Sequence, residues 1–248
     1  CLADGSPQGT DVYKTVKKYM DKDSRIRYKK LGRNQGISEN TNAAIAMASG
    51  DYIVLADHDD AMTENALYEC ARAVREHPDC QVIYSDEDKM DMDGGALFDP
   101  HFKPDFNPDL LTSVNYICHQ FVVKKDLVDK VGGLRKEFDG AQDYDFIFRC
   151  TEAAKGVWHI PKVLYHWRCH ADSTAENTAS KCYAYDAGRE ALLAFCAGQH
   201  WQVNVEHGLH LGFYEIAYTP DLLAVRQEVG LVGGRLLDGR GRICGGAM

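Results

Sequence analysis

The sequence predicts an α/β fold in which a mixed, mostly parallel sheet lies between helices. Short apolar segments such as 51–56 and 121–123 alternate along the chain with segments of helical spacing such as 63–77. Glycine or proline follows most of the helical segments, and a cluster of acidic residues directly follows one apolar segment. Strands that alternate with helices are typical of a sheet covered on both faces, and ligands bind such sheets at the carboxyl ends of the strands.

The first third of the chain carries clear start and stop signals. Ser38 and Thr63 are typical N-cap residues, and Gly50 and the pair His77-Pro78 end the helices that these caps begin. The expected elements are, in order, a strand ending at residue 3, a helix over 11–18, a strand over 25–28, a helix over 38–49, a strand over 51–56, a helix over 63–77 and a strand over 81–85.

Prolines and glycines also delimit the remaining elements. Prolines at 100, 104 and 108 predict an ordered loop over 99–116, and glycines at 132, 133 and 156 end two helices. The expected elements are a strand over 121–123, helices over 125–131 and 143–155, strands over 157–160 and 163–167, and a helix over 181–198. The glycine-rich tail from Glu228 predicts a strand, a turn and a second strand.

Composition narrows the class of protein. The 248 residues are 45% apolar and 26% charged, with a net charge of −9, which is ordinary for a globular protein and argues against one that coats nucleic acid. No apolar run reaches the roughly 18 residues of a membrane span. The nine cysteines contain no Cys-x-x-Cys pair and indicate free thiols in a reducing compartment.

Three acidic residues, Asp57, Asp59 and Asp60, lie at the end of the apolar strand 51–56. Carboxylates this close repel one another, and a divalent cation would supply the missing positive charge. Oxygen ligands favour magnesium or manganese. The alternative is a capping turn, in which Asp60 or Thr63 begins the next helix and the other acids are solvated.

A phosphohydrolase of haloacid-dehalogenase type is a second interpretation of this cluster, with Asp57 as its nucleophile. Such enzymes usually have threonine or valine two residues after the second acid, where this chain has Ala61. Their downstream acids and lysine are matched only loosely by Asp86–Lys89.

A series of motifs in a fixed order resembles glycosyltransferase family two. In the first half they are Arg33–Gly36, Asn42–Ala44, Ala48–Tyr52 and Asp57–Asp60. In the second half Tyr84–Asp88, Lys103–Phe106, Gln142–Asp145 and His159–Arg168 resemble the rhamnosyl- and cell-wall-glycan branch of that family. The resemblance covers residues 1 to about 218, and it implies the GT-A fold and an inverting enzyme that uses nucleotide sugars.

The resemblance implies that an acceptor hydroxyl attacks the anomeric carbon of a UDP- or dTDP-sugar and that the nucleoside diphosphate leaves. It also implies a manganese or magnesium ion that offsets the charge of the leaving group. Its expected ligands are Asp59, Asp57 and a late histidine, for which His170 is the first choice and His166 the second.

The nucleotide is expected to contact Asp4, Arg33, Gly36, Asn42 and Asp57. Asp4 can accept the imide N–H of a pyrimidine, or it can form a side-chain turn with the residues that follow it. Arg33 either closes the base pocket or is a solvated loop charge.

Asp143, at the start of a helix, is the expected catalytic base that takes the proton of the acceptor hydroxyl. Its alternative role is that of an acid favoured by the helix dipole, which is the preferred interpretation of Asp145. Contacts to the donor or acceptor sugar are expected from Asp86, Glu87, Gln142, Trp167 and Arg168. The alternatives are a solvated turn for Asp86 and Glu87, and packing for Trp167.

We expect residues 1–218 to form one GT-A domain without its first strand, and residues 219–248 to resemble part of a second copy. The full protein would then pair this unit with a second glycosyltransferase domain. Its partners would be a nucleotide-sugar donor and a glycan or lipid-linked glycan acceptor in cell-surface polysaccharide synthesis, with no nucleic acid. A cytoplasmic location at the inner face of the membrane fits this role. The alternative is a non-catalytic half that only binds sugar nucleotides.

Overall fold

The computed structural model describes residues 1–169, 182–218, 226, 235–237 and 243–246. The first elements are β1 (Leu2–Asp4), α1 (Val12–Met20), β2 (Tyr28–Lys30), α2 (Ile37–Ile45), β3 (Tyr52–Leu55), β4 (Ala61–Met62), α3 (Ala66–Glu76) and β5 (Val82–Met90). They are followed by β6 (Leu97–His101), α4 (Pro108–Leu111), β7 (Phe121–Lys124), α5 (Lys125–Val131), the 3-10 helix η1 (Lys136–Phe138), α6 (Gln142–Ala153) and β8 (Val157–Arg168). The last elements are α7 (Cys182–Gly198), β9 (Val203–His207), β10 (Tyr214–Tyr218), β11 (Arg235–Leu237) and β12 (Ile243–Gly246).

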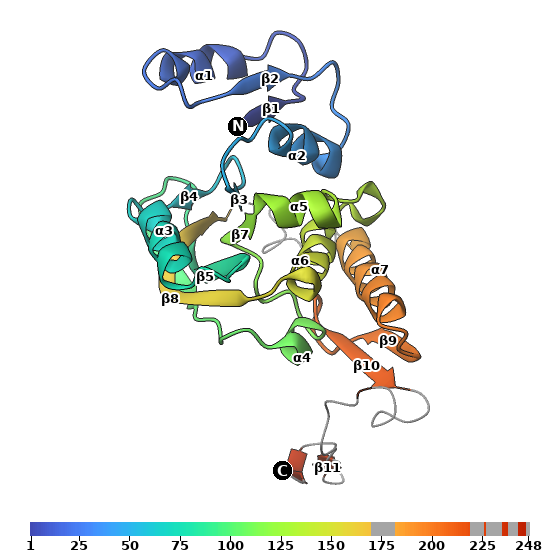
Figure 1. Ribbon diagram of the computed structural model, residues 1–248. Coiled ribbons are helices and arrows are strands. Elements are labelled where there is room, and N and C mark those ends of the chain that lie inside the picture. The colour runs from blue at the N-terminus through green and yellow to red at the C-terminus, as the bar shows by residue number, and fades with distance from the viewer. Residues whose placement is uncertain (170–181, 219–225, 227–234, 238–242, 247–248) are drawn as a thin grey trace.

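A six-stranded mixed sheet forms the centre of the molecule (Figure 1). Its strand order is β3-β7-β5-β8-β4, and β6 pairs with β5 beside this path. Within this sheet only β5 and β8 pair in parallel, whereas the sequence predicts a mostly parallel sheet. Part of the difference arises from the short connections between strands. Parallel neighbours need a crossover of about a dozen residues or more, and the connection from β5 to β6 is too short for that, so these two strands are antiparallel.

The strands β1 and β2 form a separate parallel pair, which lies with α1 and α2 at the top of Figure 1. Helix α2 connects this unit to the rest of the molecule. The Asn42 side-chain amide donates to the Leu134 carbonyl and accepts from the Leu134 N–H, both at 2.8 Å. The Ser38 hydroxyl donates to the Asp139 carboxylate at 2.5 Å. Helix α2 is thus fixed against the segment that leads into α6.

The large sheet packs helices on both of its faces, as expected. Along β5, Val82 and Tyr84 belong to the apolar core shared with α5, α6 and α7, while Ile83 belongs to the core shared with α3. Strand β7 alternates in the same way, and all these side chains are buried. The alternation follows from the two-residue period of a strand, which directs successive side chains to opposite faces.

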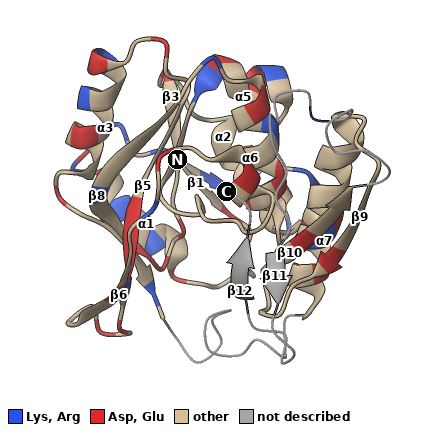
Figure 2. Cartoon of the chain, turned by 90° about the horizontal axis from the view of Figure 1, so that it is seen from below, with Lys and Arg blue, Asp and Glu red and all other residues tan. Residues whose placement is uncertain are grey.

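Strand β5 extends to Met90, five residues beyond its expected end at Ser85. The acidic residues Asp86, Glu87 and Asp88 therefore lie inside the sheet and are buried, so the alternative of a solvated turn for Asp86 and Glu87 is wrong. Figure 2 marks these acidic residues along β5. Their burial is tolerated because each carboxylate has a polar partner. Asp86 pairs with His159 at 2.8 Å, Glu87 with Lys103 at 3.2 Å and Asp88 with His166 at 2.5 Å.

The antiparallel hairpin of β9 and β10 is not among the expected elements. It packs its buried residues Val205 and Tyr214 into the core beside α6 and α7. The two strands of the tail, β11 and β12, pair antiparallel and agree with the two expected strands; the turn expected between them lies outside the described residues.

Asp145 lies in the first turn of α6, where the sequence analysis assigns it a helix-dipole role, but it also has two arginine partners. It is buried in α6 and forms ion pairs with Arg135 and with Arg149, the latter at 2.8 Å. Arg149 also donates to the carbonyl oxygens of residues 131–133. The carboxylate thus links α6 to the loop that receives α2.

We predict that Asp145→Ala lowers the free energy of unfolding by about 3 kcal/mol, because it leaves two guanidinium groups without their buried partner. Urea denaturation followed by circular dichroism measures this loss. Asp126→Ala is the matched control, since Asp126 lies in the first turn of α5 with a largely exposed ion pair, and its change should stay within about 0.5 kcal/mol. Equal losses in the two variants would contradict the prediction.

Candidate active site

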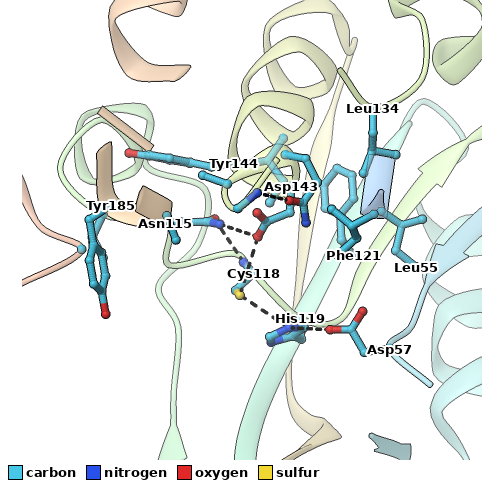
Figure 3. A pocket seen from close by; sticks show the side chains of 18 of the residues that line it. Leu55, Asp57, Asn115, Cys118, His119, Phe121, Leu134, Asp143, Tyr144 and Tyr185 are labelled. Carbon is cyan, nitrogen blue, oxygen red and sulfur yellow. Dashed lines mark hydrogen bonds and ion pairs between the residues drawn. The ribbon is translucent and has the colours of Figure 1, made fainter. Parts of the chain in front are cut away.

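A cavity of about 570 Å³ opens where β3 ends and α6 begins. Asp57 enters it from the loop after β3, and Asp143 enters it from the first turn of α6. Asn115, Cys118 and His119 come from the segment before β7; Cys118 and His119 lie between the two carboxylates, and Asn115 contacts Asp143 (Figure 3). The structure thus brings together the two acids that the sequence assigns to the donor and acceptor sides of a transfer reaction.

The acidic loop after β3 is pinned to β8. The Tyr165 hydroxyl donates to the Asp60 carboxylate at 2.6 Å and accepts from the Asp57 N–H at 3.1 Å. The Arg168 N–H donates to Asp60 at 2.8 Å, and the Arg168 guanidinium donates to the Asp59 carbonyl at 2.6 Å. Arg168 does not line the cavity, so its observed contacts are those of a residue that positions the loop.

Asp57, Asp60 and His119 form a group that fits a divalent cation. One ligand atom from each residue lies within 4.8 Å of the other two. Partial burial in the cavity raises the pKa of Asp57, and Asp60, Asp59 and Asp143 raise it further, while His119 opposes the shift. Carboxylate and imidazole groups are both common ligands of divalent cations in proteins.

Of the expected metal ligands, Asp57 belongs to this group, whereas the other described candidates, Asp59 and His166, do not. Among the atoms described, the Asp59 side chain lies beside His58, with 3.9 Å between carboxylate oxygen and ring nitrogen. His166 pairs with Asp88 instead of facing Asp57. His170 lies outside the described residues. His119 carries no signal in a single sequence, because its approach to Asp57 depends on the pairing of β7 with β3.

Asp143 is oriented for contact with a ligand in the cavity. The Asn115 side-chain amide donates to its carboxylate at 2.8 Å, and the Cys118 thiol lies 4.0 Å away. Gln142 and Trp167, which the sequence assigns to sugar contacts, line the same cavity. Asp86 and Glu87 do not line it.

A second cavity, of about 880 Å³, lies beside the ends of β1 and β2 and includes Arg33 in its wall. Asp4 is buried next to it and accepts hydrogen bonds from Tyr28 at 2.6 Å, Lys30 at 3.0 Å and the Ser6 N–H at 2.8 Å. Burial alone would raise the pKa of Asp4, but these hydrogen bonds hold it well below its usual value. The turn with Ser6 is therefore present, and the carboxylate is ionised beside the cavity.

Two other residues assigned to the nucleotide shape the backbone between the cavities. Gly36 has φ +99°, and a Cβ added there would lie 2.7 Å from the Asp139 carboxylate. Only glycine combines this backbone conformation with so close an approach. The Asn42 amide is engaged on both sides with Leu134, so in this structure it fixes α2.

No described helix is long and apolar enough to cross a membrane. Among the described cysteines, Cys1, Cys70, Cys80, Cys118, Cys150 and Cys196 carry free thiols.

Comparisons with known proteins match the sequence to one family. The profile of the family described as Glycosyl transferase family 2 matches residues 1–132. An uncharacterized protein of Sinorhizobium fredii is 43% identical over 77% of this chain, and the O-antigen biosynthesis protein RfbC of Myxococcus xanthus is 34% identical over 80% of it. The chain spans only 21% and 16%, respectively, of these two relatives.

A comparison with solved structures supports the GT-A fold. The S. aureus protein TarS 1-349 in complex with UDP-GlcNAc aligns with a TM-score of 0.56 at 17% sequence identity, over 79% of this chain and 62% of TarS 1-349. At this level of identity the match concerns the fold alone.

We predict that Tyr165→Phe loosens the acidic loop, because it removes the hydroxyl that bridges Asp60 and the Asp57 N–H. Hydrogen exchange of the backbone amides over 57–60 should become faster, and the free energy of unfolding should fall by about 1 to 2 kcal/mol. Tyr52→Phe is the control, since its hydroxyl donates to the Cys80 carbonyl at 3.0 Å, away from the loop. Unchanged exchange over 57–60 in Tyr165→Phe would refute this role.

Proposed function

We propose, from the premise that this chain belongs to glycosyltransferase family 2, that it transfers a sugar from a nucleoside diphosphate to a glycan hydroxyl with inversion at the anomeric carbon. The observation that carries the proposal is the shared cavity of Asp57 and Asp143. An inverting transfer needs the acceptor's base and the leaving group's cation on opposite sides of one sugar, and the two carboxylates enter the cavity from different elements (Figure 3). The relatives named for O-antigen, chondroitin and hyaluronan synthesis support a polysaccharide product.

On the donor side, Asp57, Asp60 and His119 would hold manganese or magnesium. When bound, the cation offsets the negative charge that develops on the leaving diphosphate. Asp59 belongs to the same short loop and stays a candidate ligand, because its carboxylate is one residue from Asp60. The spacing of the three side chains supports a cation at this position, since one ligand atom from each lies within 4.8 Å of the other two.

The nucleotide would occupy the second cavity, with its base near Asp4 and Arg33. The carboxylate of Asp4 is ionised, so it can accept the imide N–H of uracil or thymine in exchange for one of its present donors. Helix α2 contributes to both cavities, through Asn40 in the second and Ile37 in the first. A diphosphate passing the start of α2 would join them. The UDP-GlcNAc complex of TarS supports a uridine donor.

The acceptor would approach Asp143 from the opposite end of the cavity, where Tyr185, Phe213 and Tyr214 contribute aromatic rings. Aromatic rings that line a concave site suit the apolar face of a sugar. As the acceptor oxygen bonds to the anomeric carbon, the bond from that carbon to the diphosphate breaks and Asp143 takes the hydroxyl proton. Asn115 keeps the carboxylate turned toward this position.

The whole protein would combine this domain with further segments, since the chain spans about a fifth or less of the two relatives described. A second glycosyltransferase domain and a lipid-linked acceptor are part of this proposal. The free thiols support a reducing, cytoplasmic location at the inner face of the membrane. We also propose that residues 1–218 form the transferase domain and that the tail belongs to the next one.

We predict that UDP or dTDP raises the melting temperature only together with manganese, because the cation and the diphosphate share one site. A thermal-shift screen of UDP, dTDP and GDP, each with and without manganese, tests this, and a ligand at one hundred times its dissociation constant stabilises by about 2.7 kcal/mol. Asp57→Asn should abolish the shift, and comparing Asp59→Asn with Asp60→Asn identifies the second carboxylate ligand. The absence of a shift with every pair would contradict the donor assignment and favour the non-catalytic alternative.

We predict that Asp143→Asn lowers the rate of sugar transfer by about 10² to 10⁴-fold and leaves the nucleotide-induced thermal shift unchanged, because it removes only the base. Release of UDP or dTDP in the presence of an acceptor glycan measures the rate. Asp126→Asn, on the exposed surface of α5, should match the wild type. A phosphohydrolase with Asp57 as nucleophile would instead keep its activity in Asp143→Asn, and that result would reverse the assignment.

A further inference from the structure

Glu87 is buried beside the basic side chains of His101, Lys103 and His119, yet it does not line the active-site cavity. One carboxylate oxygen, Oε2, lies 3.2 Å from each of three nitrogens: the His119 backbone N–H, His119 Nδ1 and Lys103 Nζ. The other oxygen lies 3.6 Å from His101 Nδ1. These contacts bring two separate segments of the chain to one strand of the sheet.

The contacts define which nitrogen of His119 faces the cavity. Because Nδ1 lies against an ionised carboxylate, it carries a proton and donates it. The opposite nitrogen, Nε2, then lies 3.8 Å from the Asp57 carboxylate and 3.7 Å from the Cys118 thiol. The ring also stacks on Tyr165, with 4.9 Å between the ring centroids and 7° between the planes.

Lys103 contacts both Glu87 and the backbone of His119. Its side chain is fully buried, and its ammonium group donates to the Ile117 carbonyl at 2.6 Å, to the His119 carbonyl and to Glu87. The ammonium group thus fixes the backbone on which His119 stands and neutralises the carboxylate that holds the His119 ring. Burial lowers the pKa of Lys103, whereas its pairing with Glu87 favours the charged form.

We infer that Glu87 is a positioning residue, which holds His119 through Nδ1 and turns Nε2 toward the cation site beside Asp57 and Asp60. The inference rests on the proposed function, because it assumes that His119 is a metal ligand there. A carboxylate behind a metal-bound imidazole fixes the orientation of the ring and raises its basicity, and loss of such a partner weakens metal binding by about 10- to 100-fold.

The adjacent residue on the same strand offers a matched control. Asp88 is as buried as Glu87 and accepts from a histidine at 2.5 Å, but that histidine, His166, does not belong to the Asp57 group. Glu87→Gln and Asp88→Asn therefore make the same change, from carboxylate to amide, in two neighbouring carboxylate–histidine pairs. Only the first pair faces the cation site.

The test is the dissociation constant of manganese for the full chain, measured by isothermal titration calorimetry without nucleotide. Glu87→Gln should bind manganese 10- to 100-fold more weakly than the wild type, and Asp88→Asn should stay within about threefold. In His119→Ala, adding Glu87→Gln should weaken binding no further, because Glu87 acts through the ring that is already missing. In ¹⁵N-labelled protein, the His119 ring signals should show Nδ1 protonated in the wild type and a mixture of tautomers in Glu87→Gln.

Unchanged manganese binding in Glu87→Gln, or additive losses in the double variant, would overturn the role of Glu87. A wild type that binds no manganese would instead overturn the proposed cation site, and the inference would fall with it. If Glu87→Gln does not fold, Glu87→Gln/Lys103→Met removes the buried charge together with its partner and is measured in its place. A normal dissociation constant in that variant would again contradict the inference.

Discussion

The crowding of negative charge after β3 is the constraint on which the rest of the site depends. Residues 57–60 are three aspartates and one histidine. Like charges at this spacing destabilise a loop unless hydrogen bonds from other groups stabilise it. The protein supplies those groups from β8, through the hydroxyl of Tyr165 and the backbone and guanidinium of Arg168. The loop is thereby held in a shape that leaves two carboxylates directed at one position, and an imidazole approaches the same position from the segment before β7.

The two cavities lie in two different units of the fold. The small unit of β1, β2, α1 and α2 carries the cavity beside Asp4, and the six-stranded sheet with α6 and α7 carries the cavity of Asp57 and Asp143. Helix α2 contributes side chains to both cavities and is fixed by Asn42 and Ser38 to the segment that leads into α6. Two residues that the sequence assigns to the nucleotide have structural roles here: Gly36 forms the turn that begins α2, and Asn42 holds α2 against Leu134.

The sequence predicts most of the element types correctly because their signals are local. Caps and glycines mark α2, α3 and α5, and Asp57 and Asp143 stand at the end of a strand and at the start of a helix. The length of β5 could not be predicted, because three successive acids normally indicate a solvent-exposed segment. Their partners, His159, Lys103 and His166, come from distant segments that the local sequence does not reveal. His119 could not be found for the same reason: its role depends on which strands pair, which a single sequence does not state. The parallel content of the sheet was overestimated because strand–helix alternation does not reveal where β6, β7 and β4 turn back.

Because Glu87 lies in β5, the position of the His119 ring depends on the alignment of the strands in the sheet. Successive side chains of a strand point to opposite sides, so Glu87 meets His119 while its neighbours Asp86 and Asp88 meet histidines of β8. Sliding β5 by a single residue against β7 and β8 would exchange these partners and leave an acid facing apolar side chains. A misaligned sheet would therefore lose ion pairs as well as packing contacts. The alignment that preserves both also places the His119 ring beside Asp57.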